Sequence, residues 1–240
     1  MTAWKVPPAA RRKRTLNRDA IVEAAVKVLE RDGYDALTTR KVADELGVKS
    51  ASLYWHIETK EALEDLLADE LLAGSAFGDF TADWRADLRN GSLRLFRHLM
   101  SRRDAGRILA GRLVAGPHTL RWMEACLDPF RRAGLSDRDA AFAGHAVHVY
   151  LIGFVIFQGA DLSAEARKGS SRQEILDRAR VLFAGLSPAE FPNLTALAEP
   201  LTVADREGRF LFGIDCLIAG IERQARSGAG RSASAPDRAG

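Results

Sequence analysis

The chain contains little cysteine: two residues, Cys126 and Cys216, among 240. They lie far apart and match no metal-binding or redox spacing, so the sequence indicates neither a disulfide scaffold nor a zinc module. Each falls in an apolar helical pattern, which predicts two buried free thiols. Free thiols are typical of the reducing cytosol, so the expected location is cytoplasmic.

Long hydrophobic segments are lacking as well. The N-terminus is basic, but the apolar core of a signal peptide does not follow it. The longest apolar stretch, Val147–Phe157, is too short to span a bilayer and suits a buried core or interface helix. We therefore expect no membrane partner.

Sequence signatures of catalysis are also missing. The chain has no Gly-rich phosphate loop, nucleophile elbow or paired-carboxylate arrangement, so we predict no catalytic residue, no cofactor and no enzymatic activity. The net charge of +3 excludes a histone-like polycation, but residues 1–18 hold six basic side chains and no acidic one. Residues 1–16 are expected to form a disordered basic arm, which either follows nucleic-acid phosphates or is a solvated tail.

Apolar residues recur at helical spacing along the chain, and no convincing strand alternation interrupts them, which predicts an all-α fold. The expected helices span residues 18–32, 38–46, 50–56, 60–73, 81–103, 105–114, 117–133, 136–160, 171–184 and 205–226. Residues 185–204 contain three prolines and are expected to form an irregular loop. The Gly/Ser/Ala-rich residues 227–240 are expected to form a disordered tail.

Residues 37–60 (LTTRKVADELGVKSASLYWHIETK) are the most informative part of the chain. The pattern predicts two short helices around a tight turn at Gly47, where a residue tolerant of positive φ is needed. In the second helix Ala51 and Leu53 are expected to face inward, which leaves hydroxyl, aromatic and imidazole side chains outside. A short helix of this kind fits the major groove of DNA. The alternative is a helical hairpin within the core of an all-α protein.

The stretch TTRKVADELGVKSASLYWHIETKEAL resembles the DNA-binding segment of the TetR family of bacterial transcriptional regulators, especially its tetracycline-repressor branch. The resemblance is dense from Asn17 to Leu72 and looser beyond. It implies an N-terminal three-helix helix-turn-helix DNA-binding domain (residues 17–75) and a larger helical effector-binding and dimerisation domain (residues 76–226). It also implies a homodimeric repressor that a ligand releases from a palindromic, double-stranded DNA operator.

The operator contacts of that branch can be carried over residue by residue. They come from the Thr-Arg pair that opens the motif, from the recognition helix, and from the lysine that opens the next helix. The matching residues are Thr39, Arg40, Lys49, Ser50, Ser52, Tyr54, Trp55, His56 and Lys60. Arg40 is the candidate for reading guanine, whereas Tyr54, His56 and Lys60 are candidate phosphate contacts. The run Lys49-Ser50-Ala51 replaces an acidic-amide-proline run, so we expect a different operator sequence.

The resemblance also bears on the ligand. Tetracycline repressors hold a drug–magnesium complex through histidine, amide and carboxylate side chains. The matching positions here are Ala76, Gly91, Leu109, Cys126 and Phe157, which supply no oxygen or imidazole donor. We therefore expect no tetracycline–magnesium binding and no bound metal.

An apolar pocket for a small, flat hydrophobic effector is expected instead. Its candidate residues are Leu95, Leu99, Leu109, Leu113, Trp122, Met123, Cys126 and Phe157, with His118 or His148 as a polar handle. The alternative is that these residues are plain core. His145 and His148 lie three apart on one expected helix and raise the separate hypothesis of a metal sensor, although no nearby cysteine or carboxylate completes a tetrahedral set.

Two of the expected helices, residues 136–160 and 205–226, are apolar over more than one face. Such helices must be covered on every side. A second copy of the chain would cover them in a four-helix interface across a two-fold axis, which agrees with the homodimer that the resemblance implies. The alternative is a buried central helix in a monomer.

Other functions stay open at this point. The same fold serves transcriptional activators and ligand-dependent DNA binders. A helical transferase and an architectural, non-specific DNA binder are the two remaining classes. The modest net charge and the large apolar C-terminal region argue against the architectural protein.

Overall fold

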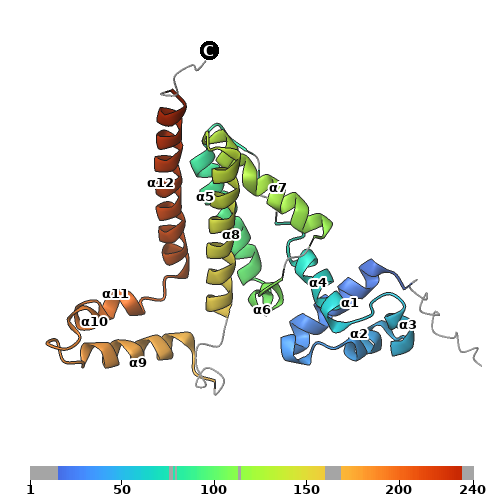
Figure 1. Cartoon of the computed structure of the whole chain (residues 1–240). Helices are drawn as coiled ribbons and strands as arrows, with labels where there is room; N and C mark the ends of the chain where they lie inside the picture. Colours follow the sequence, from blue (N-terminus) through green and yellow to red (C-terminus); the bar gives the residue numbers. More distant parts are fainter. Residues whose placement is uncertain (1–15, 76–77, 79, 113–114, 160–168, 234–240) are drawn as a thin grey trace, which may run out of the picture. The chain divides into compact units, whose positions relative to one another are not determined.

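The computed structural model describes residues 16–75, 78, 80–112, 115–159 and 169–233. Within these ranges the chain forms twelve α-helices and no β-strand, which confirms the predicted all-α fold (Figure 1). The chain divides into two compact units between Leu67 and Ala68, inside α4 (Lys60–Leu71). The expected basic arm lies outside the described residues apart from Leu16.

The first unit consists of α1 (Arg18–Asp32), α2 (Thr39–Leu46), α3 (Ser50–Tyr54) and the first turns of α4, with a short 3-10 turn at Tyr34–Ala36. Local side chains cap the starts of α1, α2 and α4. The side chain of Asn17 accepts a hydrogen bond from the backbone N–H of Ala20 at 2.9 Å. Thr38 accepts one from Lys41 at 3.2 Å, and Thr59 one from Ala62 at 3.1 Å. Each bond satisfies a backbone donor that the helix itself leaves unpaired.

The core of this unit follows the predicted periodicity. The inward face of α1 is buried, as are Leu37, the centre of α2 and the helical stripe of α4. The fully or almost fully buried residues are Ile21, Ala24, Ala25, Val28, Leu29, Val42, Ala43, Leu53, Leu63 and Leu67. Ala51 was expected to face inward and is instead exposed. In a helix of only five residues, Leu53 alone reaches the core, which leaves Ala51 on the outer side.

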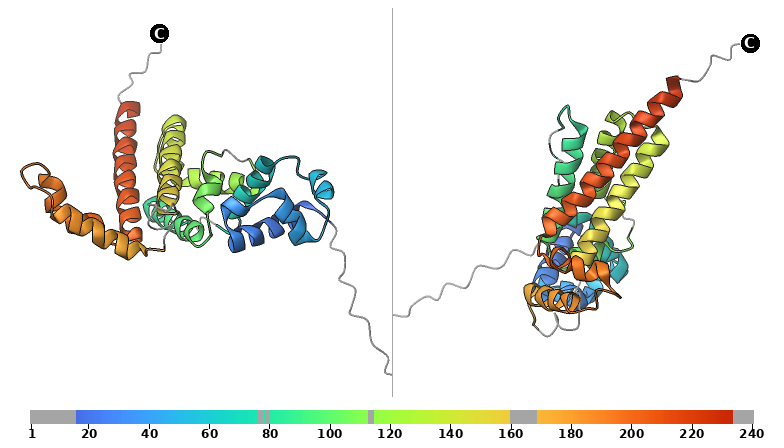
Figure 2. Two further views of the ribbon diagram at one scale, coloured as in Figure 1. Left: turned by 90° about the horizontal axis from the view of Figure 1, so that it is seen from below. Right: turned by 90° about the vertical axis from the view of Figure 1, so that its left-hand side faces the viewer.

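The second unit contains the remaining helices. Its larger part is built from α5 (Trp84–Met100), α6 (Ala105–Leu109), α7 (Pro117–Arg132), α8 (Asp137–Gly159) and α12 (Arg206–Ala233). Between α8 and α12 the chain forms α9 (Arg172–Ala184), α10 (Pro192–Ala196) and α11 (Ala198–Thr202), which pack on one another. α12 packs against both α5 and α8 (Figures 1 and 2).

An aromatic cluster joins these three long helices. The rings of Phe96 (α5) and Phe210 (α12) stack with their centroids 4.4 Å apart, and Phe154 (α8) meets both edge-on at 5.6 and 5.4 Å. Tyr150 of α8 donates its hydroxyl hydrogen bond to the carbonyl oxygen of Phe210 at 2.9 Å. Gly213 permits this contact, because a Cβ there would lie 2.1 Å from the Tyr150 oxygen.

Two predictions about the C-terminal third of the chain are wrong in detail. Residues 185–204 were expected to form an irregular loop, but they contain α10 and α11. Pro192 and Pro200 each fall in the first turn of one of these helices, where the missing N–H removes no helical bond. The final helix extends to Ala233 rather than to residue 226, so residues 227–233 of the expected disordered tail are helical. Ser227 adds a side-chain bond to the carbonyl of Arg223 at 3.0 Å beyond the expected end.

The two cysteines differ in environment. Cys126 is a buried free thiol, as predicted, but Cys216 is exposed on α12. Cys216 falls on the same side of α12 as Phe212, one turn earlier, whose side chain is 73% exposed. The apolar pattern there is therefore real, but the described residues of this chain do not bury it.

By length and composition alone, α8 could cross a membrane between Asp137 and Gln158, so the expectation that no such segment exists is wrong by this measure. Small residues such as Ala143 and Ala146 extend the apolar stretch Val147–Phe157 toward the start of the helix. A core helix passes the same test, and α8 packs against α5, α6, α7 and α12 within the second unit.

A buried carboxylate fixes the start of α5. Asp87, which is 5% exposed, accepts hydrogen bonds from the backbone N–H and hydroxyl of Thr81 and from the Arg132 guanidinium at 2.6 Å. Arg132 also donates to the Thr81 carbonyl at 2.7 Å. Burial acts to raise the pKa of Asp87, but the bonds from Arg132 and Thr81 outweigh it and lower that pKa below its usual range.

We predict that Arg132→Met lowers the free energy of unfolding at pH 7 by about 1–3 kcal/mol, because Asp87 keeps its bonds to Thr81 but loses its counter-charge. The neighbouring Arg131 makes a surface ion pair with Asp137 at 3.2 Å, so the control Arg131→Met should cost no more than about 1 kcal/mol. Urea denaturation of both variants measures the difference. Because the pKa of Asp87 is lowered on folding, its contribution exists above its ordinary pKa and disappears as pH falls through the lowered value. Equal stability of the two variants at pH 7 contradicts the assignment.

Candidate functional site

The surface of the first unit around α3 is shaped by one buried residue. Leu53 is fully buried, and the short helix therefore turns its neighbours outward. Tyr54 is 49% exposed, and Trp55 is 89% exposed. The helix was predicted to continue to His56, but it ends at Tyr54. Trp55 and His56 lie in the turn that follows it. A large exposed aromatic side chain next to a buried anchor indicates a contact surface.

The turn between α2 and α3 orients this surface. Gly47 adopts φ 69°, and its N–H bonds back to the carbonyls of Ala43 and Asp44. The chain thereby closes α2 in a left-handed cap that favours glycine. A side-chain contact then ties the helices together, since the oxygens of Thr39 and Tyr54 lie 3.2 Å apart.

The basic residues of this unit fall into two groups. Lys41 pairs with Asp32 at 3.1 Å, and Arg31 pairs with Glu45 at 2.8 Å, so their charges are partly neutralised within the protein. Arg40 and Lys49 are exposed and make no ion pair with a described residue. Their cationic side chains are therefore available to an external anionic surface.

All nine candidate DNA contacts lie in the first unit and reach its surface. Thr39 and Ser50 are partly exposed, and the other seven are exposed: Arg40, Lys49, Ser52, Tyr54, Trp55, His56 and Lys60. Lys60 also contacts the protein, since its ammonium lies 3.4 Å from Glu64 and 5.1 Å from the centre of the Tyr34 ring.

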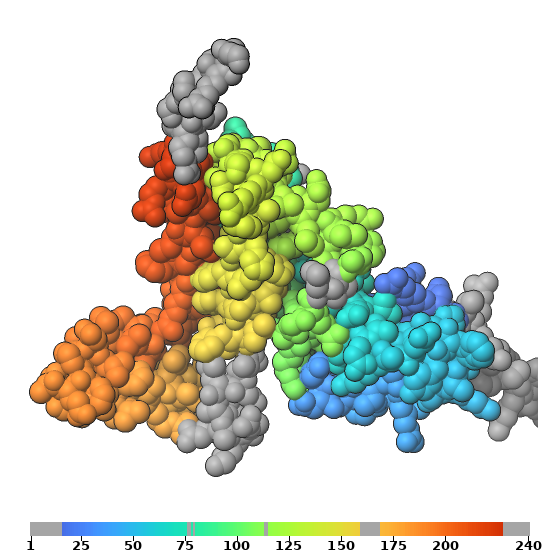
Figure 3. Space-filling model, in the orientation of Figure 1, coloured from blue at the N-terminus to red at the C-terminus, as the bar shows by residue number. Residues whose placement is uncertain are grey.

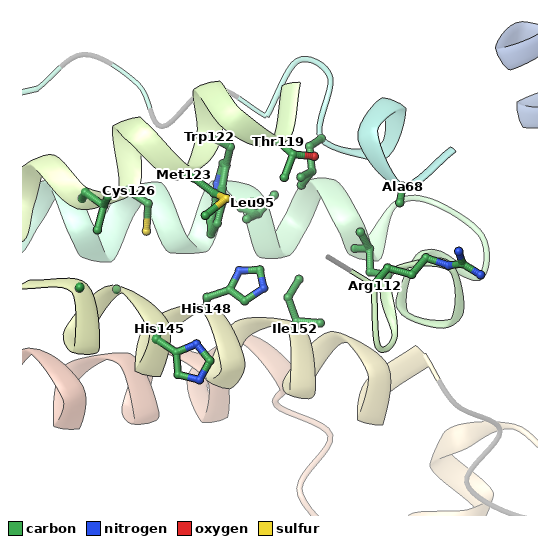
Figure 4. Close-up of a pocket in the computed structure, with 15 residues that line it drawn as sticks. Ala68, Leu95, Arg112, Thr119, Trp122, Met123, Cys126, His145, His148 and Ile152 are labelled. Atoms are coloured by element: carbon green, nitrogen blue, oxygen red, sulfur yellow. The ribbon is translucent and has the colours of Figure 1, made fainter. Parts of the chain in front are cut away.

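The second unit contains a cavity of about 310 Å³ (Figure 4). Six of the candidate ligand residues line it: Leu95, Leu109, Trp122, Met123, Cys126 and His148. They come from α5, α6, α7 and α8. Gly106 brings α6 close enough to contribute, because a Cβ there would lie 2.8 Å from the backbone of Ile156 in α8.

Three other candidates do not line the described cavity. Leu99 belongs to the core at 1% exposure, and Phe157 lies on the surface at 61%. His118 is partly exposed and contributes a backbone N–H to Asp69 rather than its imidazole to the cavity. Leu113 lies outside the described residues. The helical pattern indicates which of these residues lie on apolar helix faces. It does not indicate which of them border an open cavity, because that depends on how the neighbouring helices pack.

Nine lining residues escaped the prediction: Ala68, Leu72, Arg112, Thr119, Leu127, Ala141, Gly144, His145 and Ile152. For α8 the sequence could have predicted them, because residues 141, 144, 145, 148 and 152 recur at the spacing of one helix face, which already included the candidate His148. Ala68 and Leu72 belong to the end of α4 and the turn after it, and no pattern assigned them to the cavity.

Among the described lining residues that carry polar groups, Trp122 and Cys126 are buried, whereas His145 and His148 are exposed. The Trp122 ring lies 5.5 Å from the ring of His148, and its indole N–H makes no hydrogen bond to a described residue. His148 is reachable through the open cavity, yet the surrounding protein atoms and the nearby His145 lower its pKa. Burial raises the pKa of the Cys126 thiol to about 12, so this side chain is neutral at physiological pH.

These properties bear on metal binding. Among the described residues there is no group of three His, Cys, Asp or Glu side chains that could hold a metal ion. The neutral thiol of Cys126 is a poor ligand beside the two histidines. Of the positions that match the tetracycline–magnesium site, Leu109 and Cys126 line the cavity, Gly91 is buried in α5, and Ala76 lies outside the described residues.

Sequence comparison identifies two family regions. Residues 21–65 match the bacterial regulatory proteins of the tetR family, and residues 78–225 match the tetracyclin repressor-like C-terminal domain. The chain is 31% identical over 214 residues to the tetracycline repressor protein class D of Escherichia coli, which covers 87% of this chain and 90% of that protein.

Structural comparison gives the same family. Apo ActR from Streptomyces coelicolor superposes with a TM-score of 0.80 at 29% identity, covering 90% of this chain and 99% of that chain. ActR in complex with actinorhodin superposes with a TM-score of 0.77 at 30% identity, covering 86% and 95%. The chain therefore belongs to the TetR family of bacterial transcriptional regulators, and it is a DNA-binding regulator rather than an enzyme.

Proposed function

We propose that this regulator is a cytoplasmic homodimeric repressor that binds a palindromic operator and is released by a small hydrophobic effector. Residues 17–75 act as the DNA-binding domain, and residues 76–226 bind the effector and the second copy. The two family regions support this division, since one ends at residue 65 and the other begins at residue 78.

The assignment of the DNA-binding surface rests on one observation. Charged and aromatic side chains are exposed around the short helix α3, which Leu53 anchors in the core. Arg40 lies at the start of α2, where its guanidinium can reach the O6 and N7 atoms of a guanine. Lys49 precedes α3 and reads a base or a phosphate. Tyr54, His56 and Lys60 contact phosphates and set the register, and Trp55 lies along the backbone.

The cavity in the second unit is the proposed effector site. Its volume of about 310 Å³ is at the lower end of the range for small-molecule sites, and most of its described lining is apolar. ActR, which shares this fold, has been crystallised with actinorhodin. By analogy we infer that a flat, largely apolar organic molecule occupies the cavity here.

The proposed homodimer is supported by an apolar surface that the described residues of one chain leave exposed. On α8, Phe142, Val149 and Phe157 are 60%, 52% and 61% exposed. On α12, Phe212 is 73% exposed and the small residue Ala219 lies two turns further along the same face. Figure 3 shows α8 (yellow) and α12 (red) side by side at the surface. Two such helix pairs facing across a two-fold axis would bury these residues.

Helix α4 provides the proposed route between effector and DNA. Lys60 at its start is a candidate phosphate contact, whereas Ala68 in its last turn and Leu72 after it line the cavity. A helix transmits a shift along its axis with little deformation. An effector that displaces the last turn would move the two recognition helices away from the spacing of successive major grooves, about 34–36 Å.

Footprinting of the DNA that flanks the protein's own gene, in competitor DNA at physiological salt, tests the proposed function. Protection of a palindrome supports a dimeric, sequence-specific regulator. Uniform weak protection with the same salt dependence on random DNA would contradict it. A transcription assay from the protected site then distinguishes a repressor from an activator.

We predict that Arg40→Ala weakens discrimination between the operator and a single-base variant by about 1–3 kcal/mol, because a bidentate guanine contact is lost. Lys41→Ala is the matched control. It removes the same charge from the next position, but from a lysine already paired with Asp32. Fluorescence anisotropy on both duplexes measures the change. Unchanged discrimination in Arg40→Ala removes this residue from base reading.

We predict that Phe212→Glu separates the dimer, because two carboxylates would face an apolar interface. The expected loss is about 2 kcal/mol or more of association free energy. Leu120→Glu on α7 is the control, since that side chain is 53% exposed but lies on neither α8 nor α12. Sedimentation velocity measures the mass of each variant. A Phe212→Glu variant that remains dimeric places the interface elsewhere.

A further inference from the structure

The first unit contains a hollow beside the candidate DNA-contact residues. It joins the start of α1, the turn after α3 and the first turns of α4. Its volume is about 220 Å³, and its described lining consists of Arg18, Ile21, His56, Ile57, Ala62 and Leu66. The hollow therefore brings the candidate phosphate contact His56 together with the start of α1, which contains none of the nine candidate DNA contacts.

The hollow has an apolar floor and a basic rim. Ile21 and Ile57 are buried at 0% and 2% exposure, whereas Arg18 and His56 are exposed. Arg18 supplies a permanent positive charge, because an arginine stays protonated at any physiological pH. The imidazole of His56 carries at least one N–H donor in either protonation state. A cation above an apolar wall attracts an anion more strongly than one that water surrounds on all sides.

The guanidinium of Arg18 is available to an external partner. It makes no hydrogen bond or ion pair with a described residue. The other two basic residues of α1 are engaged within the protein, since Lys27 pairs with Glu23 at 3.0 Å and Arg31 pairs with Glu45 at 2.8 Å. Arg18 is therefore the basic side chain of α1 whose charge the described part of the protein does not neutralise.

Acidic side chains neighbour the hollow in the sequence without lining it. Asp19, Glu58, Glu61 and Asp65 are exposed and are not part of the described lining. Salt weakens the field of exposed charges within about 8 Å at physiological ionic strength. Arg18 would act on an anion in the hollow at contact distance, whereas these carboxylates would act on it through solvent.

The backbone of DNA suits this arrangement. It presents phosphates, which accept charge-assisted hydrogen bonds from arginine, and sugar rings, which can pack on an apolar floor. His56 and Lys60 are already candidate phosphate contacts, so the hollow continues the proposed DNA-binding surface. The sequence that leads to Arg18 is also basic, because residues 1–14 contain five Lys or Arg residues and no Asp or Glu. This charge favours the approach of the same end of the chain to DNA.

We propose that Arg18 is a further DNA contact, and that its guanidinium, together with His56 at the rim of the hollow, binds a phosphate of the DNA backbone. The inference rests on the proposed function, because it adds an anchor to the proposed DNA-binding surface. The contact carries no sequence information and strengthens binding to every duplex.

Fluorescence anisotropy of the full-length protein on its operator duplex and on a random duplex, at several salt concentrations, tests this proposal. Arg18→Gln should weaken binding to both duplexes by a similar factor, about threefold or more at physiological salt, and should reduce the salt slope by about one for each chain bound. Arg18→Lys should retain most of the slope, because lysine also contacts phosphate as a point charge. An Arg18→Gln variant with the affinity and slope of the wild type overturns the proposal.

Lys27→Gln is the charge-matched control. It removes one positive charge from the same helix, but from a side chain that already pairs with Glu23 and is not part of the described lining of the hollow. Its affinity and salt slope should match those of the wild type. Equal losses in Lys27→Gln and Arg18→Gln would show an effect of net charge alone and would overturn the assignment of Arg18.

Ethylation interference on the operator locates the contact. One phosphate in each half-site, whose ethylation weakens binding of the wild type, should have no effect on the binding of Arg18→Gln. An interference pattern that is the same for both proteins contradicts a phosphate contact at Arg18.

The random duplex separates this proposal from the proposed function, because a phosphate contact needs no palindrome. If Arg18→Gln lowers the salt slope on random DNA but no palindrome is protected, the contact stands and the sequence-specific repressor fails. If the wild type and Arg18→Gln protect the same palindrome with the same salt slope, the proposed function stands and the contact fails.

Discussion

The structure of the second unit depends on one helix that is apolar on nearly every side. α8 buries Val147, Leu151 and Val155 against its neighbours, and its other faces remain apolar. One of them lines the cavity with His148 and Ile152. The other carries Phe157 at 61% exposure, and the adjoining α12 carries Phe212 at 73%. Because water is a poor solvent for such faces, we infer that a ligand covers the first and a protein neighbour covers the second. The proposed effector and the proposed second copy would do so, and both would contact the same helix.

The first unit differs from the second because it holds large side chains, such as Trp55, exposed to solvent. Its reading surface depends on short helices with well-capped ends, where a single buried leucine, Leu53, fixes α3. The αL conformation at Gly47 and the Thr39–Tyr54 contact orient that helix without burying it. Trp55 is 89% exposed, and the exposed Arg40 and Lys49 make no ion pair with a described residue. They are therefore best explained by an external anionic partner.

The sequence was sufficient to predict the all-α fold, the helix-turn-helix and the turn at Gly47, because these depend on local periodicity and on residues a few positions away. It was sufficient for only part of the cavity. Leu95 and Leu99 occupy one face of α5 a single turn apart, yet only Leu95 meets the open space. That difference depends on the packing of α6 and α7, which no local pattern contains. The same reason explains Cys216, which has a core-like sequence context but lies on a face that the described residues of this chain leave exposed. The roles of the nine DNA-contact candidates come from the resemblance and stay predictions.

The central claim is that the open face of α8 and α12 joins two copies and thereby sets the spacing of the two recognition helices. The mass of the complex with its protected duplex, measured by sedimentation equilibrium together with the footprint, tests this claim most directly. The account predicts two chains of 26.3 kDa per palindrome, or a multiple of two. The half-site centres should lie about 10–10.5 base pairs apart or at a multiple of that distance. One chain on a single half-site, at concentrations that saturate the DNA, would contradict it.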